Sequence, residues 1–439
     1  MTTDQWIRDL PSTWTIARLG SLGSLSKGSG GSKEDNRDSG VAVVRYGELY
    51  GKFDRIIREP QSFISPDDAS RYTPLPTGTL VFAGSGEDPE EIGKAALSLL
   101  PAPAFVGGDA VLFAPRPGSV DPVYLTYVLA SKPLKAYKAV RSTGFTVVHI
   151  SAGKLKTLPI PLPPLGEQRA IADYLDHETD QIDALVAKQE ALIRYLEERR
   201  LAVITTTALT GLQSEEPGAR DVTRWGSSLA VEPWLVRAPR TWGMERFKTV
   251  CLVRQERNVA GTELMLSLTV KGHLIDRSTM AVQQNASDAS LPRYFVARPN
   301  DLVVNPMWLI GGAIGVSDKR GAVSPDYRVF EIDERLDPWY LHAVLRSAPY
   351  FDQYKLYTRS NTTFDRRIKQ NDLDNLPLPI PPLGEQRAIV EHIGEQTGRI
   401  DALIAKAEEH IALAKERRSA LITAAVTGQV HVRTARKAR

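Results

Sequence analysis

The sequence predicts an α+β protein in which two mixed α/β globular domains alternate with two long helices. A segment of 47 residues occurs twice, at 158–204 and 376–422, and 26 of its positions are identical at a constant offset of 218. Each copy continues as a heptad pattern of apolar residues. The two blocks that precede the copies also share a skeleton of motifs. Together these observations predict an internal repeat with a pseudo-two-fold relation.

Each copy of the repeat opens with a proline-rich stretch, LPIPLPPLGEQRAI in the first and LPLPIPPLGEQRAI in the second. Proline lacks an amide donor and restricts the residue before it, so a helix can begin only after these prolines. Both patterns finish in Thr-Gly, at 210–211 and 427–428, where glycine suits a left-handed C-cap. The apolar heptad positions are Ile182, Val186, Ile193, Leu196 and Val203 in the first copy and Ile400, Ile404, Ile411, Ala414 and Leu421 in the second.

Helices of this length with so narrow an apolar stripe need a partner helix. Two arrangements satisfy that need: the two copies pack together within the chain, or each pairs with another chain. If the copies pack antiparallel within the chain, a pseudo-two-fold relates the two similar units and holds the globules far apart. We therefore expect two long helices packed as an antiparallel coiled coil.

The blocks before the copies share three features. Each begins with P-x-T-W, at Pro11–Trp14 and Pro239–Trp242, and each later contains a short apolar run after a turn. Each also has an Asp-Pro pair that suits a helix N-cap, at Asp121 and Asp337. The expected boundaries are a globular domain at 1–157, a helix at 158–211, a polar linker at 212–224, a globular domain at 225–375, a helix at 376–428 and a basic tail at 429–439.

Composition excludes several classes of protein. The formal net charge is +3 and the pI about 8.7, which permits nucleic-acid binding without demanding it. Met1 is not followed by a signal peptide pattern, and no apolar run reaches the length of a membrane span, so we expect a cytoplasmic protein. Cys251 is the single cysteine, which excludes an internal disulfide and a cysteine-based zinc site.

The sequence segments that are similar to catalytic or phosphate-binding motifs lack residues that those motifs require. Asn305–Trp308 is similar to the motif of amino-methyltransferases but lacks its second proline, and no glycine-rich cofactor loop follows a strand in the same block. The Gly93-Lys94 pair lacks the spacing and the hydroxyl of a phosphate-binding loop. Neither a G-x-S-x-G nucleophile motif nor paired histidine ligands occur. We expect no cofactor, no metal and no catalytic activity of this chain's own.

The doubled PPLGEQRAI segment, feeding a long helix after a block that begins P-x-T-W, resembles the specificity subunit of type I restriction-modification enzymes. The resemblance implies that 1–157 and 225–375 are target recognition domains, each reading one half of an interrupted, asymmetric double-stranded DNA site. It implies that the helices set the gap between the halves. The implied partners are two adenine-methylating (modification) subunits and, in the full enzyme, restriction subunits that translocate DNA.

Candidate DNA-binding residues are those whose side chains commonly contact base edges and phosphates. In the first domain they are Lys27, Lys33, Arg37, Arg45, Tyr46, Arg141 and Thr143. In the second they are Arg254, Gln255, Arg257, Asn258, Arg359, Ser360, Asn361, Thr362, Arg366 and Arg367. The alternative for any one of them is a solvated surface residue, whereas the clusters are stronger candidates than the single residues.

The charged residues of the repeat have structural interpretations as well as functional ones. Glu167, Gln168 and Arg169, with Glu385, Gln386 and Arg387, suit the first turn of a helix and could also contact the methylating subunit. The Arg199-Arg200 and Arg417-Arg418 pairs suggest a favourable interaction with the helix C-terminal dipole. Two other functions stay open: a coiled-coil scaffold that binds proteins rather than DNA, and a methyltransferase, which would require S-adenosylmethionine bound by the isolated chain.

Overall fold

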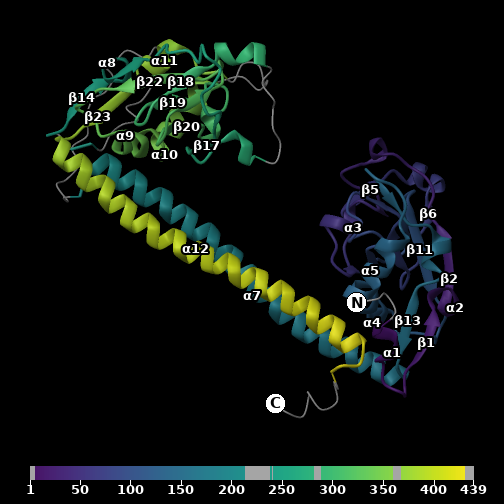
Figure 1. The fold of residues 1–439 in the computed structure, drawn as a ribbon. Coiled ribbons are helices and arrows are strands. Elements are labelled where there is room, and N and C mark those ends of the chain that lie inside the picture. The colour runs from purple at the N-terminus through teal and green to yellow at the C-terminus, as the bar shows by residue number, and fades with distance from the viewer. Residues whose placement is uncertain (1–4, 213–237, 240, 281–287, 359–366, 431–439) are drawn as a thin grey trace. The chain divides into compact units, whose positions relative to one another are not determined.

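The computed structural model describes residues 5–212, 238–239, 241–280, 288–358 and 367–430 and divides into two compact units (Figure 1). Unit 1 comprises Met1–Glu190 and Glu409–Arg439, and unit 2 comprises Ala191–Glu408. Each unit therefore contains one globular block together with a part of both long helices.

The globular part of unit 1 is built on two sheets. The five-stranded sheet has the order β2-β11-β7-β9-β4 and the four-stranded sheet the order β5-β3-β10-β6. The central strand β7 is buried on both faces, and its residues alternate as a period of two requires. Leu80 and Phe82 pack with the helices, whereas Val81 and Ala83 pack toward the second sheet. The strands are β1 (Thr15–Arg18), β2 (Gly23–Lys27), β3 (Val41–Val44), β4 (Ile56–Ile57), β5 (Ser62–Ile64), β6 (Thr73–Pro74), β7 (Leu80–Ala83), β8 (Ser85–Gly86), β9 (Ala95–Ser98), β10 (Ala104–Val106), β11 (Ala110–Pro115), β12 (Val148–His149) and β13 (Pro159–Leu162).

Short helices cover one face of the five-stranded sheet. The expected N-cap is confirmed: the backbone N–H of Tyr124 donates to Asp121 Oδ1 at 2.9 Å, and Pro122 opens the helix. Tyr124 and Tyr127 are buried in the core that this helix forms with the sheet. The helices are α1 (Gln5–Arg8), α2 (Leu19–Leu22), α3 (Glu48–Gly51), α4 (Pro122–Ala130), α5 (Lys132–Arg141) and α6 (Ala152–Leu155), with 3-10 helices η1 (Lys33–Asp35) and η2 (Pro66–Arg71).

The globular part of unit 2 repeats the use of a buried sheet with helices on one face. Its four-stranded sheet has the order β15-β22-β19-β20. Asp337 caps the helix that corresponds to α4, accepting from the backbone N–H groups of Trp339 and Tyr340. The strands are β14 (Gly243–Arg246), β15 (Cys251–Val253), β16 (Leu266–Leu268), β17 (Leu274–Asp276), β18 (Phe295–Ala297), β19 (Leu302–Val304), β20 (Ile314–Val316), β21 (Gly321–Val323), β22 (Arg328–Ile332) and β23 (Pro377–Ile380). The helices are α8 (Phe247–Val250), α9 (Pro338–Leu345), α10 (Ala348–Tyr357) and α11 (Gln370–Asp374), with η4 (Arg277–Thr279), η5 (Asp288–Arg293) and η6 (Leu309–Gly311).

The long helices are α7 (Leu165–Thr210) and α12 (Leu383–Val426), and each begins directly after its prolines. All ten expected heptad residues are buried or half-buried. Many exposed positions carry charged residues, while others carry apolar ones such as Leu185 and Leu403. No helix among the described residues is long and apolar enough to cross a membrane. Gly211 and Gly428 follow the two helices with φ of 78° and 74°, which confirms the left-handed caps.

The two helices pack antiparallel in each unit. In unit 1, the start of α7 near Leu175 shares a core with the end of α12 near Ile422, while Asp183 further along α7 contacts Arg418. In unit 2, Ala208 at the end of α7 shares a core with Ile389 at the start of α12. The expected fold class, with an antiparallel helix pair within the chain, is confirmed.

The proline-rich stretches form short edge strands. In unit 1, β13 pairs antiparallel with β1, and in unit 2, β23 pairs antiparallel with β14. The tryptophan of each P-x-T-W motif then packs at the end of the long helix from the other half of the sequence. A Cβ on Gly428 would lie 3.6 Å from the ring of Trp14, and one on Gly211 would lie 3.0 Å from the ring of Trp242. Each globule is thus attached to both long helices.

Candidate nucleic-acid interface

A cavity of about 820 Å³ opens in unit 1 where the end of β2, the turn before α3 and the β10–β11 turn converge. We call it the glycine-walled cavity, because glycines make up much of its lining. Three candidate DNA-binding residues, Lys27, Arg45 and Tyr46, lie on it. Its other lining residues are Gly28, Ser29, Gly30, Gly31, Asn36, Gly47, Glu48, Gly51, Lys52, Ser62, Gly107, Gly108 and Asp109.

Two glycines in the wall are required by close contacts. Gly30 has φ of 91°, and a Cβ there would lie 1.9 Å from the carbonyl oxygen of Arg71. Gly31 has φ of 66°, and a Cβ there would lie 1.6 Å from the hydroxyl oxygen of Tyr72. The Gly30 carbonyl also accepts from the backbone N–H of Gly108 at 3.0 Å. At Gly30 and Gly31 the wall is therefore backbone without a side chain, which allows a ligand to approach the main chain closely there.

The arginine of this cavity is held by its neighbours. Arg45 donates to Asn36 Oδ1 from Nε at 2.9 Å and from Nη2 at 2.6 Å, and Nη2 also lies 3.4 Å from the Tyr72 hydroxyl. Nη1 has no hydrogen bond among the described residues. The Tyr72 hydroxyl donates to Asp35 at 2.7 Å, and this bond, aided by a backbone N–H and by Arg71, lowers the pKa of Asp35. Arg45 is thus a positioned cation with donor capacity left over.

A second cavity, of about 340 Å³, shares Lys27 and Asp109 with the first. Thr143 and His149 line it, and each donates its backbone N–H to the other's carbonyl, at 3.0 and 2.8 Å. His149 Nδ1 also lies 2.8 Å from Ser85 Oγ. The structure therefore places Lys27, Arg45, Tyr46 and Thr143 on the lining of two neighbouring cavities.

Two other candidates of unit 1, Arg37 and Arg141, are not among the residues that line these cavities. Arg37 is exposed, and its Nη1 donates to the carbonyls of Glu34 and Asn36. The Arg141 guanidinium lies 3.3 Å from the centroid of the Tyr137 ring. Lys33 begins η1, and its side chain lies outside the described residues.

Two candidates of unit 2 contribute to its internal structure. Arg254 forms a two-point ion pair with Asp301, at 2.7 and 3.1 Å, and lies 3.2 Å from Glu331. Burial raises the pKa of Asp301, and the bond from Arg254 opposes that rise. Asn258 is buried, and its Oδ1 accepts from the backbone N–H of Glu263. Neither side chain points freely toward solvent.

Three candidates of unit 2 are exposed. Gln255 is exposed, the Arg257 guanidinium stacks 3.7 Å from the Phe295 ring centroid, and Arg367 lies 3.3 Å from Asp326. Candidates Arg359, Ser360, Asn361, Thr362 and Arg366 fall outside the described residues.

The glutamine of each GEQR motif joins its helix to the globule. Gln168 accepts from the backbone N–H of Asp121 at 2.8 Å and donates to the Pro163 carbonyl at 2.8 Å. Gln386 makes the corresponding bonds to Asp337 and Pro381, at 2.7 and 2.8 Å. Both glutamines are buried. They therefore orient the Asp-Pro helix against the long helix in each unit.

The flanking residues of these motifs are more accessible. Glu385 accepts from Trp242 Nε1 at 3.2 Å, while Arg169 lies 3.9 Å from Asp121 and is largely exposed. Glu167 is half-buried and Arg387 is exposed. These residues are the part of the motif that a partner could reach.

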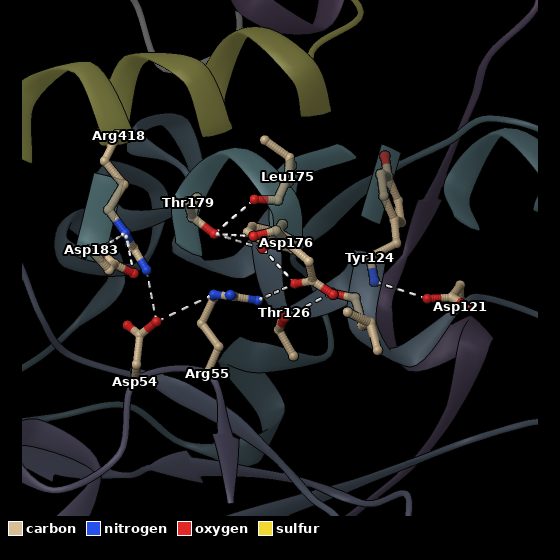
Figure 2. A network of polar contacts seen from close by, with 12 residues as sticks. Asp54, Arg55, Asp121, Tyr124, Thr126, Leu175, Asp176, Thr179, Asp183 and Arg418 are labelled. Atoms are coloured by element: carbon tan, nitrogen blue, oxygen red, sulfur yellow. Dashed lines mark hydrogen bonds and ion pairs between the residues drawn. The ribbon is translucent and has the colours of Figure 1, made fainter. Parts of the chain in front are cut away.

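A network of ion pairs ties the globule of unit 1 to both long helices (Figure 2). Arg418 contacts Asp54 at 2.7 Å and Asp183 at 3.0 Å. Arg55 contacts Asp176 at 3.3 Å and lies over the Tyr127 ring. In unit 2, Arg200 contacts Asp401 at 2.9 Å. The helix-dipole interpretation of Arg200 and Arg418 was wrong, because both lie well before the last helical turn and pair with carboxylates instead.

Sequence reasoning missed several residues of the hollows. Asn36, which holds Arg45, and the Gly107-Gly108 pair carry no motif of their own. A usable signal was Gly107-Gly108-Asp109, since two glycines before an aspartate favour a tight turn, and Asp109 has φ of 59°. Among the described residues, no group of three or more His, Cys, Asp or Glu side chains is arranged to hold a metal ion.

Known proteins similar to this chain agree on one family. Residues 11–194 match the type I restriction modification DNA specificity domain. The EcoBI specificity subunit of Escherichia coli is 23% identical, with 66% of this chain and 62% of that protein aligned. The putative MjaX specificity subunit of Methanocaldococcus jannaschii is 22% identical over 98% of this chain and 96% of that protein.

A solved structure has the same fold over nearly the whole chain. It is described as the structural basis of complex assembly and conformational transition of the type I R-M system, and its TM-score to this chain is 0.68. The match covers 96% of this chain and 99% of the other, at 17% identity. The resemblance that the repeated motif indicated is confirmed.

Proposed function

We propose that this chain, a type I restriction-modification specificity subunit that carries the family's DNA specificity domain at residues 11–194, reads a bipartite DNA target for a methylating and restricting complex. It is a non-catalytic component, as its relatives are specificity subunits of restriction enzymes. In this proposal residues 1–157 read one half-site and residues 225–375 read the other. The helices at 158–211 and 376–428 set the unread gap, the segment 212–224 links the two halves, and 429–439 is a tail.

One observation carries the proposal: the attachment of each globule is repeated while the surface beyond it is not. Gln168 with Asp121 and Gln386 with Asp337 form the same bonds at the two junctions. The hollow lined by Lys27 and Arg45 in unit 1 is built from residues that the repeat does not duplicate. Two globular domains that are attached in the same way but present different surfaces would recognise two different half-sites.

The same repeat supports recruitment of two copies of one methylating subunit. Exposed apolar residues on the long helices occur at equivalent positions, 218 apart: Leu185 with Leu403, and Tyr195 with Leu413. Leu185 and Leu413 lie in unit 1, and Tyr195 and Leu403 lie in unit 2, where α7 also exposes Leu192 and Leu201. Two equivalent apolar patches would suit two identical partners, whereas the DNA contacts would differ.

The test is genome-wide mapping of methylated adenine by single-molecule sequencing, with and without the gene. Loss of one interrupted, asymmetric motif on deletion is the expected result, and it names both half-sites. If no motif is lost while the methylating subunit is present and active, DNA reading is excluded and protein scaffolding takes its place.

Exchange of domains tests whether each globular domain reads its own half-site. Replacing residues 1–157 by the corresponding domain of a relative with another specificity should change one half of the motif and leave the other half and the gap intact. A change in both halves would show that the two globules do not read independently.

A further inference from the structure

Phe145 is fully exposed, at 105% relative accessibility, on the loop between α5 and β12. Val147, two residues further, is 44% exposed. A phenylalanine side chain buries a large apolar area when it finds a partner, so leaving it in water forgoes a sizeable stabilisation. Phe145 is not part of the core of unit 1, so we consider a role in binding another molecule.

The loop that carries this ring is held in shape. Thr143 and His149 close its base with two reciprocal backbone hydrogen bonds, and Ser85 contacts His149 from β8. Gly144 has φ of 118°, and a Cβ there would lie 2.0 Å from the carbonyl oxygen of Val147. The ring is therefore carried by a turn of defined shape, which reduces the conformational entropy that would otherwise be lost on binding.

The base of the loop opens onto the proposed DNA-reading hollows. Thr143 and His149 line the smaller cavity together with Lys27 and Lys154. Lys27 also lines the glycine-walled cavity, as does Arg45. Between them the two cavities are lined by the cationic side chains of Lys27, Arg45, Lys52 and Lys154 and by the carboxylates of Glu48 and Asp109. Cationic groups therefore outnumber carboxylates around these cavities. A ligand that suits them has anionic groups outside and an apolar slot within, which describes duplex DNA.

We propose that Phe145 inserts between adjacent base pairs of the half-site read by unit 1 and unstacks that step. This inference rests on the proposed function, because it assigns a role within the same DNA interface. Apolar side chains that enter a base step partly unstack it and kink the duplex, and pyrimidine–purine steps yield most readily. The ring would therefore select deformable steps at a position where it forms no hydrogen bond with a base.

The test uses the full chain with its modification subunits and duplexes that carry the methylated motif. Each duplex has 2-aminopurine at one position of the half-site assigned by exchange of residues 1–157, excluding the methylated adenine, which the methylating subunit could itself displace. The wild-type complex should raise the fluorescence several-fold at one step. Phe145→Ala should abolish that rise and weaken binding on the order of tenfold.

Two variants serve as controls. Val140→Ala removes another exposed apolar side chain, 73% exposed on α5, and should leave both the fluorescence and the affinity unchanged. Phe145→Trp keeps an aromatic ring and should restore the signal. Because Phe145 is exposed, its substitution should not alter the unfolding midpoint.

Three results would overturn the insertion, and they differ from failure of the proposed function. One is a wild-type complex that binds its motif with no fluorescence rise at any probed step. The second is an unchanged rise in Phe145→Ala. The third is loss of the modification subunit from the Phe145→Ala complex with unstacking retained, which would make the ring a protein contact. A wild-type complex with no sequence-specific binding would instead refute the proposed function.

Discussion

Arg418 Nε lies 3.0 Å from Asp183 Oδ1 in unit 1, and this pair is the repeat equivalent of Arg200 and Asp401 in unit 2. Each arginine is separated from its equivalent by 218 residues, and so is each aspartate. Since the helices run antiparallel in each unit, one ion pair takes its arginine from α12 and the other from α7. The repeated sequence thus supplies both partners of both contacts.

The two equivalent arginines should differ in importance. The Arg418 side chain is 20% exposed and contacts two carboxylates, whereas the Arg200 side chain is 40% exposed and contacts one. We expect Arg418→Ala to cost about 1–3 kcal/mol of unfolding free energy and Arg200→Ala below about 1 kcal/mol. Urea unfolding of the full chain measures both. Equal losses would mean that the contact to Asp54 contributes nothing.

Gln168→Leu should destabilise unit 1 by about 1–3 kcal/mol. The substitution leaves the backbone N–H of Asp121 and the carbonyl of Pro163 without partners in a buried site. Arg169→Ala, whose side chain is 71% exposed, is the matched control and should change stability by less than about 0.5 kcal/mol. If Gln168→Leu instead kept full stability and lost a partner subunit on purification, the glutamine would be a docking residue.

Lys138 should make the stability of unit 1 depend on pH. Its ammonium group is buried and donates to the carbonyls of Gly93 and Leu129, and burial lowers its pKa from 10.5 to about 7. Between those values the unfolded chain holds a proton that the folded chain has released, so this group makes stability rise with pH. The penalty for burying the charge is complete below pH 7 and is relieved above it.

Lys138→Met isolates that effect. The free energy of unfolding should rise from pH 7 to pH 9 more steeply in the wild type than in the variant, by at most about 1.4 kcal/mol per pH unit. Urea unfolding at three pH values gives both slopes. Identical slopes would show that Lys138 keeps an ordinary pKa in the folded protein.

Alanine substitution should change stability in opposite directions at two glycines, one just after the end of α12 and one within it. Gly428 has φ of 74°, and a Cβ there would lie 2.4 Å from the Pro11 ring, so Gly428→Ala should cost at least about 1 kcal/mol. Gly398 lies within the helix with nothing near its Cβ position, and Gly398→Ala should stabilise by up to about 1 kcal/mol. Thermal unfolding distinguishes the two. A neutral Gly428→Ala would place Gly428 itself away from the Pro11 ring.

A heptad inserted into both long helices should lengthen the unread gap of the DNA target. Insertion after Glu190 and after its equivalent Glu408 preserves the heptad spacing of both helices, and the Asp183–Arg418 and Arg200–Asp401 pairs lie outside the insertions. Seven residues add about 10 Å of helix, or roughly three base pairs. Methylation mapping should show unchanged half-sites with a longer gap. An unchanged gap would mean that the helices are not the ruler.

The prediction from sequence succeeded where a pattern was both local and repeated. Proline exclusion fixed the start of α7 and α12, heptad spacing identified residues that are buried or half-buried on them, and Asp121 and Asp337 were recognisable N-caps. Each of these depends on residues close together in the chain, whose backbone restrictions act in any context. The repeated motif that indicated the resemblance to type I specificity subunits is local in the same way.

The candidate site was predictable only in part. Lys27, Arg45 and Tyr46 were identified by residue type, but Asn36 and Gly107-Gly108, which complete the same cavity, were not. Arg254 and Asn258 were of the right type and are engaged inside unit 2. Residue type gives the capacity to bind DNA, whereas exposure depends on contacts such as Asp301 with Arg254, separated by 47 residues.

By itself the sequence determined two similar halves of the chain, each a globular block followed by a long helix with defined ends, because these follow from proline, glycine and heptad positions. Only the tertiary structure decided that the helices pair antiparallel within each unit, that Arg200 and Arg418 face carboxylates rather than a helix end, and that Phe145 stands in solvent on the loop closed by Thr143 and His149. Those features depend on which distant residues meet, and a side chain's partner across the fold is not encoded in its own neighbourhood.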